Sequence, residues 1–207
     1  MFPATRVYPI TDVRLTGLTH AEQVARLIRG GATLIQLREK HLPPHDFFEQ
    51  AEQAIAVARA QGVRIVINDR VDIALALSAD GVHLGQDDIP PAAARAMLGD
   101  RAIIGFSTHT LPQARSARDL PIDYLAIGPV FRTSSKSNPH PTIGLAGLKE
   151  VRDAIGELPL VAIGGITATD VRNVLESGAS CVAVISAVLA SPEGITAATE
   201  QLIAASR

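Results

Sequence analysis

Aromatic side chains are scarce in this chain of 207 residues: Phe, Trp and Tyr together make up 3%, and tryptophan is absent. A bound ring must therefore be held mostly by aliphatic walls, hydrogen bonds and charges rather than by an aromatic cage. The single cysteine, Cys181, excludes a disulfide within one chain, which is typical of a reducing compartment. It lies in the apolar run "CVAVI", where we expect a buried core thiol rather than a nucleophile.

An excess of charge of one sign is also missing, because 19 basic and 21 acidic residues give a formal net charge of −2. A nucleic acid or an anionic membrane would therefore find no bulk electrostatic attraction. No segment approaches the roughly 18 apolar residues of a membrane span, and "MFPATRVYPITD" contains no apolar run typical of a signal peptide. We expect a cytoplasmic globular protein whose 47% hydrophobic residues build one domain over 1–207.

Short apolar runs recur evenly along the chain and predict eight strands. They are apolar on both faces rather than alternating, which indicates a parallel sheet covered by helices. The predicted strands are 7–11, 33–37, 64–68, 81–85, 102–106, 123–128, 160–164 and 181–186.

Amphipathic segments with recognisable ends lie between the predicted strands. Thr19 is a predicted N-cap of a helix that stops at Gly30 and Gly31, and Gly62 and Gly178 are further predicted stops. Eight strand–helix units in about 200 residues favour a single (β/α)8 TIM barrel. An open doubly wound sheet is the alternative, but no G-x-G-x-x-G follows the first strand.

In such a barrel the ends of the strands converge on one mouth. The second strand ends in "QLREK", and alternation along an extended chain would put Gln36, Arg38 and Lys40 on one face as an anion site. A solvated loop would also explain the charges, although an amide inside an apolar run needs a partner.

An amide and acids follow the third and fourth strands: Asn68 and Asp69 come at the end of the third, and Asp88 at the end of "GQDD" after the fourth. On neighbouring loops opposite two cations, Asp69 and Asp88 predict a Mg²⁺ site that bridges to phosphate. The alternative is that each acid caps the helix that follows it.

Further polar groups follow the later strands. Ser107 and His109 end the fifth, and His109 could be an acid/base group or a packing residue. The long loop after the sixth holds a cluster of hydroxyls and one cation that could clamp a phosphate: Thr133, Ser134, Ser135 and Lys136.

Glycines follow the seventh strand, where backbone N–H groups can approach an anion closely. Gly164, Gly165, Ile185 and Ser186 would form a phosphate pocket at the loops after strands seven and eight. One basic site with a metal and one neutral glycine site suggest two phosphorylated ligands and a transfer in which diphosphate leaves.

In order along the chain, "YPITD", "QLREK", "NDRVDIAL", "ADGVHLGQDD", "IIGFSTHT", "DYLAIGPVFRTSSK", "GLAGL", "VAIGGIT" and "GASCVAVISA" resemble the thiamine phosphate synthase family over nearly the whole chain. The resemblance implies a Mg²⁺-dependent enzyme, often a homo-oligomer, that joins a pyrimidine diphosphate to a thiazole phosphate. Diphosphate leaves first, and the thiazole nitrogen captures the pyrimidine-methyl carbocation.

The resemblance also implies roles at the matching positions. The diphosphate would contact Arg38, Lys40, Asn68, Ser135 and Lys136. The metal would be held by Asp69 and Asp88, and the pyrimidine by Gln36 and Ser107. The thiazole phosphate would contact Thr133, Gly165, Ile185 and Ser186. Catalysis would rest on Arg38, Lys40, Ser107 and Lys136.

Two features bear on the family assignment. Arg132 replaces a common proline and Ser135 a common threonine, which keeps the hydroxyl and the lysine of the loop. The related thiazole tautomerase typically lacks the full acid set, so Asp69 and Asp88 favour the synthase. A non-catalytic regulator that binds thiamine metabolites is the third hypothesis.

Overall fold

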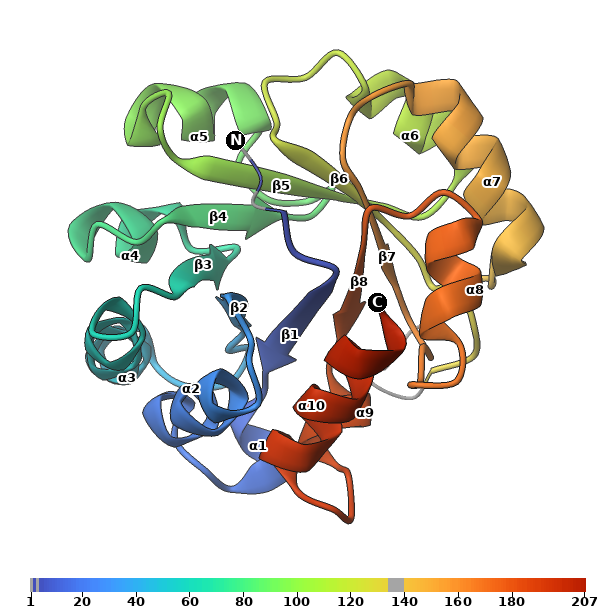
Figure 1. The fold of residues 1–207 in the computed structure, drawn as a ribbon. Helices are drawn as coiled ribbons and strands as arrows, with labels where there is room; N and C mark the ends of the chain where they lie inside the picture. Colours follow the sequence, from blue (N-terminus) through green and yellow to red (C-terminus); the bar gives the residue numbers. More distant parts are fainter. Residues whose placement is uncertain (1, 3, 134–139) are drawn as a thin grey trace.

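The computed structural model describes residues 2, 4–133 and 140–207. Eight parallel strands close into a barrel in chain order, and β1 pairs with both β2 and β8 (Figure 1). The predicted (β/α)8 barrel is therefore confirmed, and the open doubly wound sheet was wrong. The strands are β1 (Val7–Thr11), β2 (Leu34–Leu37), β3 (Arg64–Asn68), β4 (Gly81–Leu84), β5 (Ile103–Thr108), β6 (Tyr124–Ile127), β7 (Leu160–Ile163) and β8 (Cys181–Val184).

The helices lie around the outside of this barrel (Figure 1). Across the described ranges, none is long and apolar enough to span a bilayer. They are α1 (Val13–Thr16), α2 (His20–Arg29), α3 (Pro44–Arg59), α4 (Val71–Ala76), α5 (Pro91–Leu98), α6 (Leu111–Ala117), α7 (Gly144–Ile155), α8 (Val171–Glu176), α9 (Ser186–Leu189) and α10 (Ile195–Ala205).

The helix ends follow the predicted signals. The Thr19 side chain accepts from the backbone N–H of Glu22, whose carboxylate accepts from the backbone of Thr19, so α2 begins with a capping box. Gly62 and Gly178 follow α3 and α8 with φ values of 67° and 105°, which glycine adopts without the clash of a Cβ atom.

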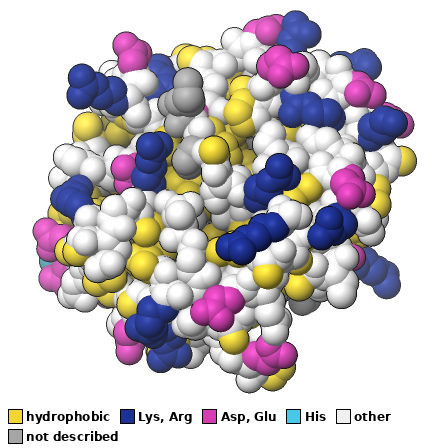
Figure 2. Space-filling view, viewed as in Figure 1, with side chains coloured by type: hydrophobic (Ala, Val, Ile, Leu, Met, Phe, Trp, Pro, Cys, Tyr) yellow, Lys and Arg dark blue, Asp and Glu magenta, His cyan; other side chains and the backbone are white. Residues whose placement is uncertain are grey.

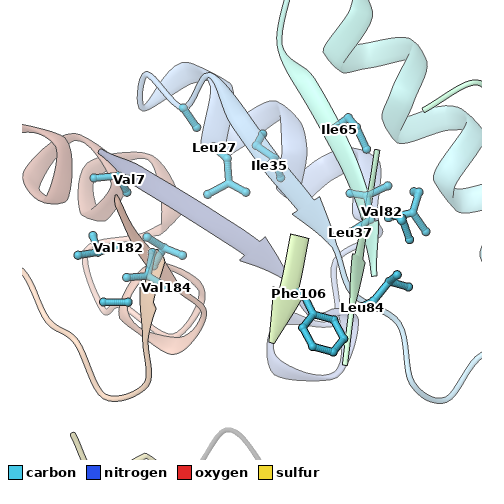
Figure 3. Packing of buried hydrophobic residues seen from close by; sticks show 14 of the residues in the cluster. Val7, Leu27, Ile35, Leu37, Ile65, Val82, Leu84, Phe106, Val182 and Val184 are labelled. Carbon is cyan, nitrogen blue, oxygen red and sulfur yellow. The ribbon is translucent and has the colours of Figure 1, made fainter. Parts of the chain in front are cut away.

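Strand side chains alternate between two apolar layers. The outer layer packs against the helices and includes Val7, Ile35, Leu37 and Val82 (Figure 3). The inner layer fills the barrel with Tyr8, Ile10, Leu34, Val66, Ile103, Tyr124, Ala126, Val161, Cys181 and Ala183. Full burial of each large aliphatic side chain contributes about 1.5–3 kcal/mol, so the two layers hold the strand ends in place.

The surface matches the balanced composition. On the face shown in Figure 2, the described basic and acidic side chains are interspersed rather than gathered by sign. Cys181 is fully buried, as predicted, and burial raises the pKa of its thiol.

Candidate active site

Two adjoining pockets open where the strands end. They share His83, Ser107, His109 and His140. The inner pocket lies among the inner-layer residues and reaches the loops after β7 and β8. The outer pocket collects the charged groups that follow β1 to β4. The structure therefore places a mostly apolar pocket beside a charged one.

Two cations of the outer pocket, Arg38 and Lys40, are each paired with an acid. A guanidinium nitrogen of Arg38 lies 2.7 Å from Oδ2 of Asp12, and Nζ of Lys40 forms an ion pair with Asp69. Glu39 fixes the intervening turn, because its Oε1 accepts from the backbone N–H groups of Lys40, His41 and Leu42. These three donors hold the pKa of Glu39 below its usual range, although burial alone would raise it.

Alternation does not continue through "QLREK", because β2 ends at Leu37. Gln36 therefore lines the inner pocket, whereas Arg38 and Lys40 line the outer one. The prediction that all three share one face was wrong. The chain leaves the extended conformation after Leu37, so the turn rather than strand alternation sets where Arg38 and Lys40 lie.

Asp69 and Asp88 both line the outer pocket, and neither is a helix cap. The N-cap positions of α4 and α5 are Arg70 and Pro90, and neither helix has a side-chain cap hydrogen bond. The Asp88 carboxylate instead accepts from the backbone N–H of Gly85 at 2.7 Å. The capping alternative was therefore wrong.

Asp69 sits in a strained backbone conformation. Its φ is 61°, a left-handed value that costs a non-glycine residue about 1 kcal/mol or more. Its backbone N–H donates to the carbonyl of His83 at 2.8 Å, which holds this conformation at the end of β3. The bend leaves the carboxylate in the outer pocket beside Lys40.

The two carboxylates are close enough to influence each other. Burial raises the pKa of Asp88, and the charge of Asp69 raises it further, while Lys40 acts in the opposite direction. Such a pair of acids suits a divalent cation. Within the described residues no group of three or more His, Cys, Asp or Glu could hold a metal ion. A pair of carboxylates such as Asp69 and Asp88 fits Mg²⁺, which keeps waters and binds phosphate oxygens.

Asn68 and Thr133, two predicted substrate-binding residues, each line one of the two pockets. Asn68 lines the outer pocket, and its Nδ2 is buried with no hydrogen-bond partner among the described residues. A buried amide donor of this kind suits a ligand oxygen. Thr133 lines the inner pocket. Ser134, Ser135 and Lys136 lie outside the described residues.

The residues of the predicted glycine site come together at the inner pocket, which is lined by Gly164, Gly165, Ile185 and Ser186. Gly164 and Gly165 have φ values of 102° and 68°. A Cβ atom on Gly165 would lie 2.3 Å from the carbonyl oxygen of Arg132, so only glycine fits there. Glycine at this position therefore lets the loop after β7 pass close to the backbone of Arg132.

His109 is held by packing and by a backbone contact. Its ring stacks on that of His140, with centroids 3.8 Å apart and an interplanar angle of 15°. Its Nδ1 donates to the carbonyl of Gly128 at 2.7 Å. That nitrogen therefore serves to orient the ring.

The family model described as thiamine monophosphate synthase matches residues 7–188. The chain belongs to this family. It is 43% identical over 198 residues to a thiamine-phosphate synthase from Chloroflexus aurantiacus, with 95% of this chain and 90% of the relative covered. A second, from Clostridium novyi, is 45% identical over 185 residues, with 89% and 90% covered.

A solved structure agrees with the family assignment. The thiamine phosphate pyrophosphorylase from Pyrococcus furiosus superposes with a TM-score of 0.86 at 38% identity, and the match covers 97% of this chain and 95% of that one. The chain is therefore a transferase of the thiamine monophosphate synthase family and functions in thiamine biosynthesis.

Proposed function

We propose that the enzyme condenses 4-amino-2-methyl-5-hydroxymethylpyrimidine diphosphate with 4-methyl-5-(2-phosphoethyl)thiazole, or its carboxylated form, to give thiamine monophosphate and diphosphate. One observation carries the proposal: a charged pocket lined by Asp69, Asp88, Arg38 and Lys40 adjoins a mostly apolar pocket that Gly164 and Gly165 line. The first suits a diphosphate with its metal, and the second suits the two rings and a monophosphate.

The outer pocket would hold the leaving group. Arg38, Lys40 and the Asn68 amide would contact diphosphate oxygens, joined by Ser135 and Lys136 from the loop. Asp69 and Asp88 would hold Mg²⁺, which when bound neutralises charge on the diphosphate. Lys40 would then exchange its ion pair with Asp69 for contacts to the substrate.

The inner pocket would hold the reacting carbons. Gln36 and Ser107 would orient the pyrimidine, while Thr133 and the backbone at Gly165, Ile185 and Ser186 would hold the thiazole phosphate. Bond breaking would produce a pyrimidine-methyl carbocation and diphosphate, and attack by the thiazole nitrogen would complete the transfer. This route needs electrostatic help for the leaving group and no strong general base.

The experiment mixes the purified protein with both substrates and Mg²⁺, and follows thiamine phosphate as its fluorescent oxidation product. We expect product only when both substrates are present, and a folded protein that makes none would overturn the proposal. Isomerisation of the thiazole phosphate without the pyrimidine would indicate the tautomerase instead. Binding of thiamine phosphate with neither reaction would indicate a regulator.

A further inference from the structure

A continuous row of hydrogen bonds crosses the barrel between the two groups proposed to contact the pyrimidine. Gln36 Nε2 donates to Tyr8 Oη at 3.1 Å, and Tyr8 Oη lies 3.2 Å from Tyr124 Oη. Tyr124 Oη lies 2.8 Å from His83 Nδ1, and His83 Nε2 lies 2.8 Å from Ser107 Oγ. We call Gln36, Tyr8, Tyr124, His83 and Ser107 the cross-barrel relay.

The middle of this relay is fixed by packing. Tyr8 and Tyr124 are almost completely buried, and their rings meet edge to face at 5.9 Å. The His83 ring stacks on Tyr124 with an interplanar angle of 18°. The Tyr124 ring also lies directly against Gly105 of β5. A Cβ atom at position 105 would lie 2.0 Å from Tyr124 Cζ, so only glycine leaves room for the ring. The hydroxyls therefore have little freedom to find other partners.

Proton counting gives the relay a direction. An amide nitrogen only donates, so Tyr8 Oη accepts from Gln36 and its own proton goes to Tyr124 Oη. The Tyr124 proton then goes to His83 Nδ1, which places the ring proton on Nε2, facing Ser107 Oγ. The opposite direction would give Tyr8 two donors and leave its own proton with no acceptor among the described residues.

We infer that the relay sets which pocket groups donate and which accept, and that Tyr8, Tyr124 and His83 are positioning residues for substrate choice. Ser107 Oγ accepts from His83, so its own proton is directed to a ligand acceptor. Gln36 donates to Tyr8, so its Oε1 is left to accept. This pattern selects a ring with an exocyclic amino group beside a ring nitrogen, the chemistry of the aminopyrimidine. The inference deepens the proposed function and rests on it.

The tautomer of His83 tests the direction without any turnover. Long-range ¹H–¹⁵N spectra of ¹⁵N-histidine-labelled protein distinguish the two neutral tautomers, and loss of one set of signals in His83→Gln assigns them. We expect the proton on Nε2. A proton on Nδ1 would overturn the inference, even if the enzyme proves to be the proposed synthase.

Substrate choice tests the consequence. The assay compares kcat/KM for the aminopyrimidine diphosphate with that for an analogue bearing an oxo group in place of the amino group. A site whose polar groups would be left unpaired rejects an analogue strongly, so we expect wild-type discrimination of at least about 100-fold. Tyr124→Phe keeps the aromatic ring but removes the hydroxyl that fixes the His83 tautomer. Discrimination between the amino and oxo substrates should therefore fall about tenfold, while the KM for thiazole phosphate stays unchanged.

Two further variants separate a relay from ordinary packing. Tyr8→Phe should lower discrimination between the two substrates as much as Tyr124→Phe does. The double variant should discriminate no less than either single variant, because loss of one hydroxyl already leaves the direction of the hydrogen bonds unfixed. Phe2→Leu is the matched control, since Phe2 packs against both tyrosine rings without joining the relay. Unchanged discrimination in Tyr124→Phe, or an equal loss in Phe2→Leu, would contradict the inference. Absence of product in the wild type would defeat the proposed function. The measured tautomer of His83 would still test the direction of the relay independently.

Discussion

Replacing Gly105 with alanine tests whether the barrel interior is built around Tyr124. The new Cβ atom would lie 2.0 Å from Tyr124 Cζ and 2.3 Å from its Oη. An ordinary carbon–carbon contact is roughly 3.5 Å, so the ring must move by about 1.5 Å. A shift of that size breaks the hydrogen bonds of Tyr124 Oη to Tyr8 and His83, which are 3.2 and 2.8 Å long.

The cost follows from these two effects. Forcing an extra methyl into a packed core costs about 1–3 kcal/mol, and a buried polar group that loses its partner costs about 1–3 kcal/mol. We therefore expect Gly105→Ala to lower the free energy of unfolding by about 2–6 kcal/mol. That is a large share of the roughly 5–15 kcal/mol that stabilises an ordinary domain.

Urea unfolding of purified protein measures this loss, with Gly62→Ala as the control. Gly62, unlike Gly105, has a positive φ, but no atom lies within 4 Å of the added methyl, so only about 1 kcal/mol of backbone strain is expected. Combining Gly105→Ala with Tyr124→Ala should cost less than the sum of the single changes, because the clash is gone. A Gly105→Ala protein no less stable than the control would refute the reasoning.

Three further outcomes are expected. Lys136→Ala should slow single-turnover product formation about 10- to 100-fold because the departing diphosphate loses a cation, and an unchanged rate would contradict that role. Cys181→Ser should lower stability by about 1–2 kcal/mol in urea unfolding and leave the turnover of folded protein intact, since the thiol is buried away from substrate; loss of turnover would overturn this assignment. Burial lowers the pKa of His20 to about 4, so the unfolded chain binds the extra proton first as pH falls below about 6.5. Between pH 7 and pH 5 the wild type should therefore lose about 2 kcal/mol more stability than His20→Gln, and equal losses would contradict the buried neutral ring.

The strands were predictable because each is a continuous apolar run, whereas their ends depend on pairing across the barrel. The fifth strand was predicted to end at residue 106, yet β5 runs to Thr108, because Ser107 and Thr108 pair with Ala126 and Ile127. The eighth was predicted to end at residue 186 but stops at Val184, since Ile185 is the N-cap of α9. Where a strand ends depends on its pairing with a neighbouring strand, so the end cannot be predicted from the sequence of that strand alone.

The charged part of the site was also predictable, because strand ends meet at one mouth whatever their separation in sequence. Sequence reasoning missed the supporting partners: Asp12 beside Arg38, Glu39 beneath the Lys40 turn, and the relay between Gln36 and Ser107. Tyr8 and Tyr124 are 116 positions apart and look like ordinary core aromatics. Alternation offered one signal, since His83 is a polar residue inside an apolar strand.

The central claim is that the acids ending β3 and β4 hold Mg²⁺ on the departing diphosphate. The most direct test measures the initial rate of thiamine phosphate formation against free Mg²⁺ in the wild type, in Asp88→Asn and in Asp100→Asn, an exposed control. We predict no product in EDTA, at least about a tenfold rise in the half-saturating Mg²⁺ concentration for Asp88→Asn, and no change for Asp100→Asn. Turnover that persists in EDTA, or one Mg²⁺ dependence for all three proteins, would contradict the claim.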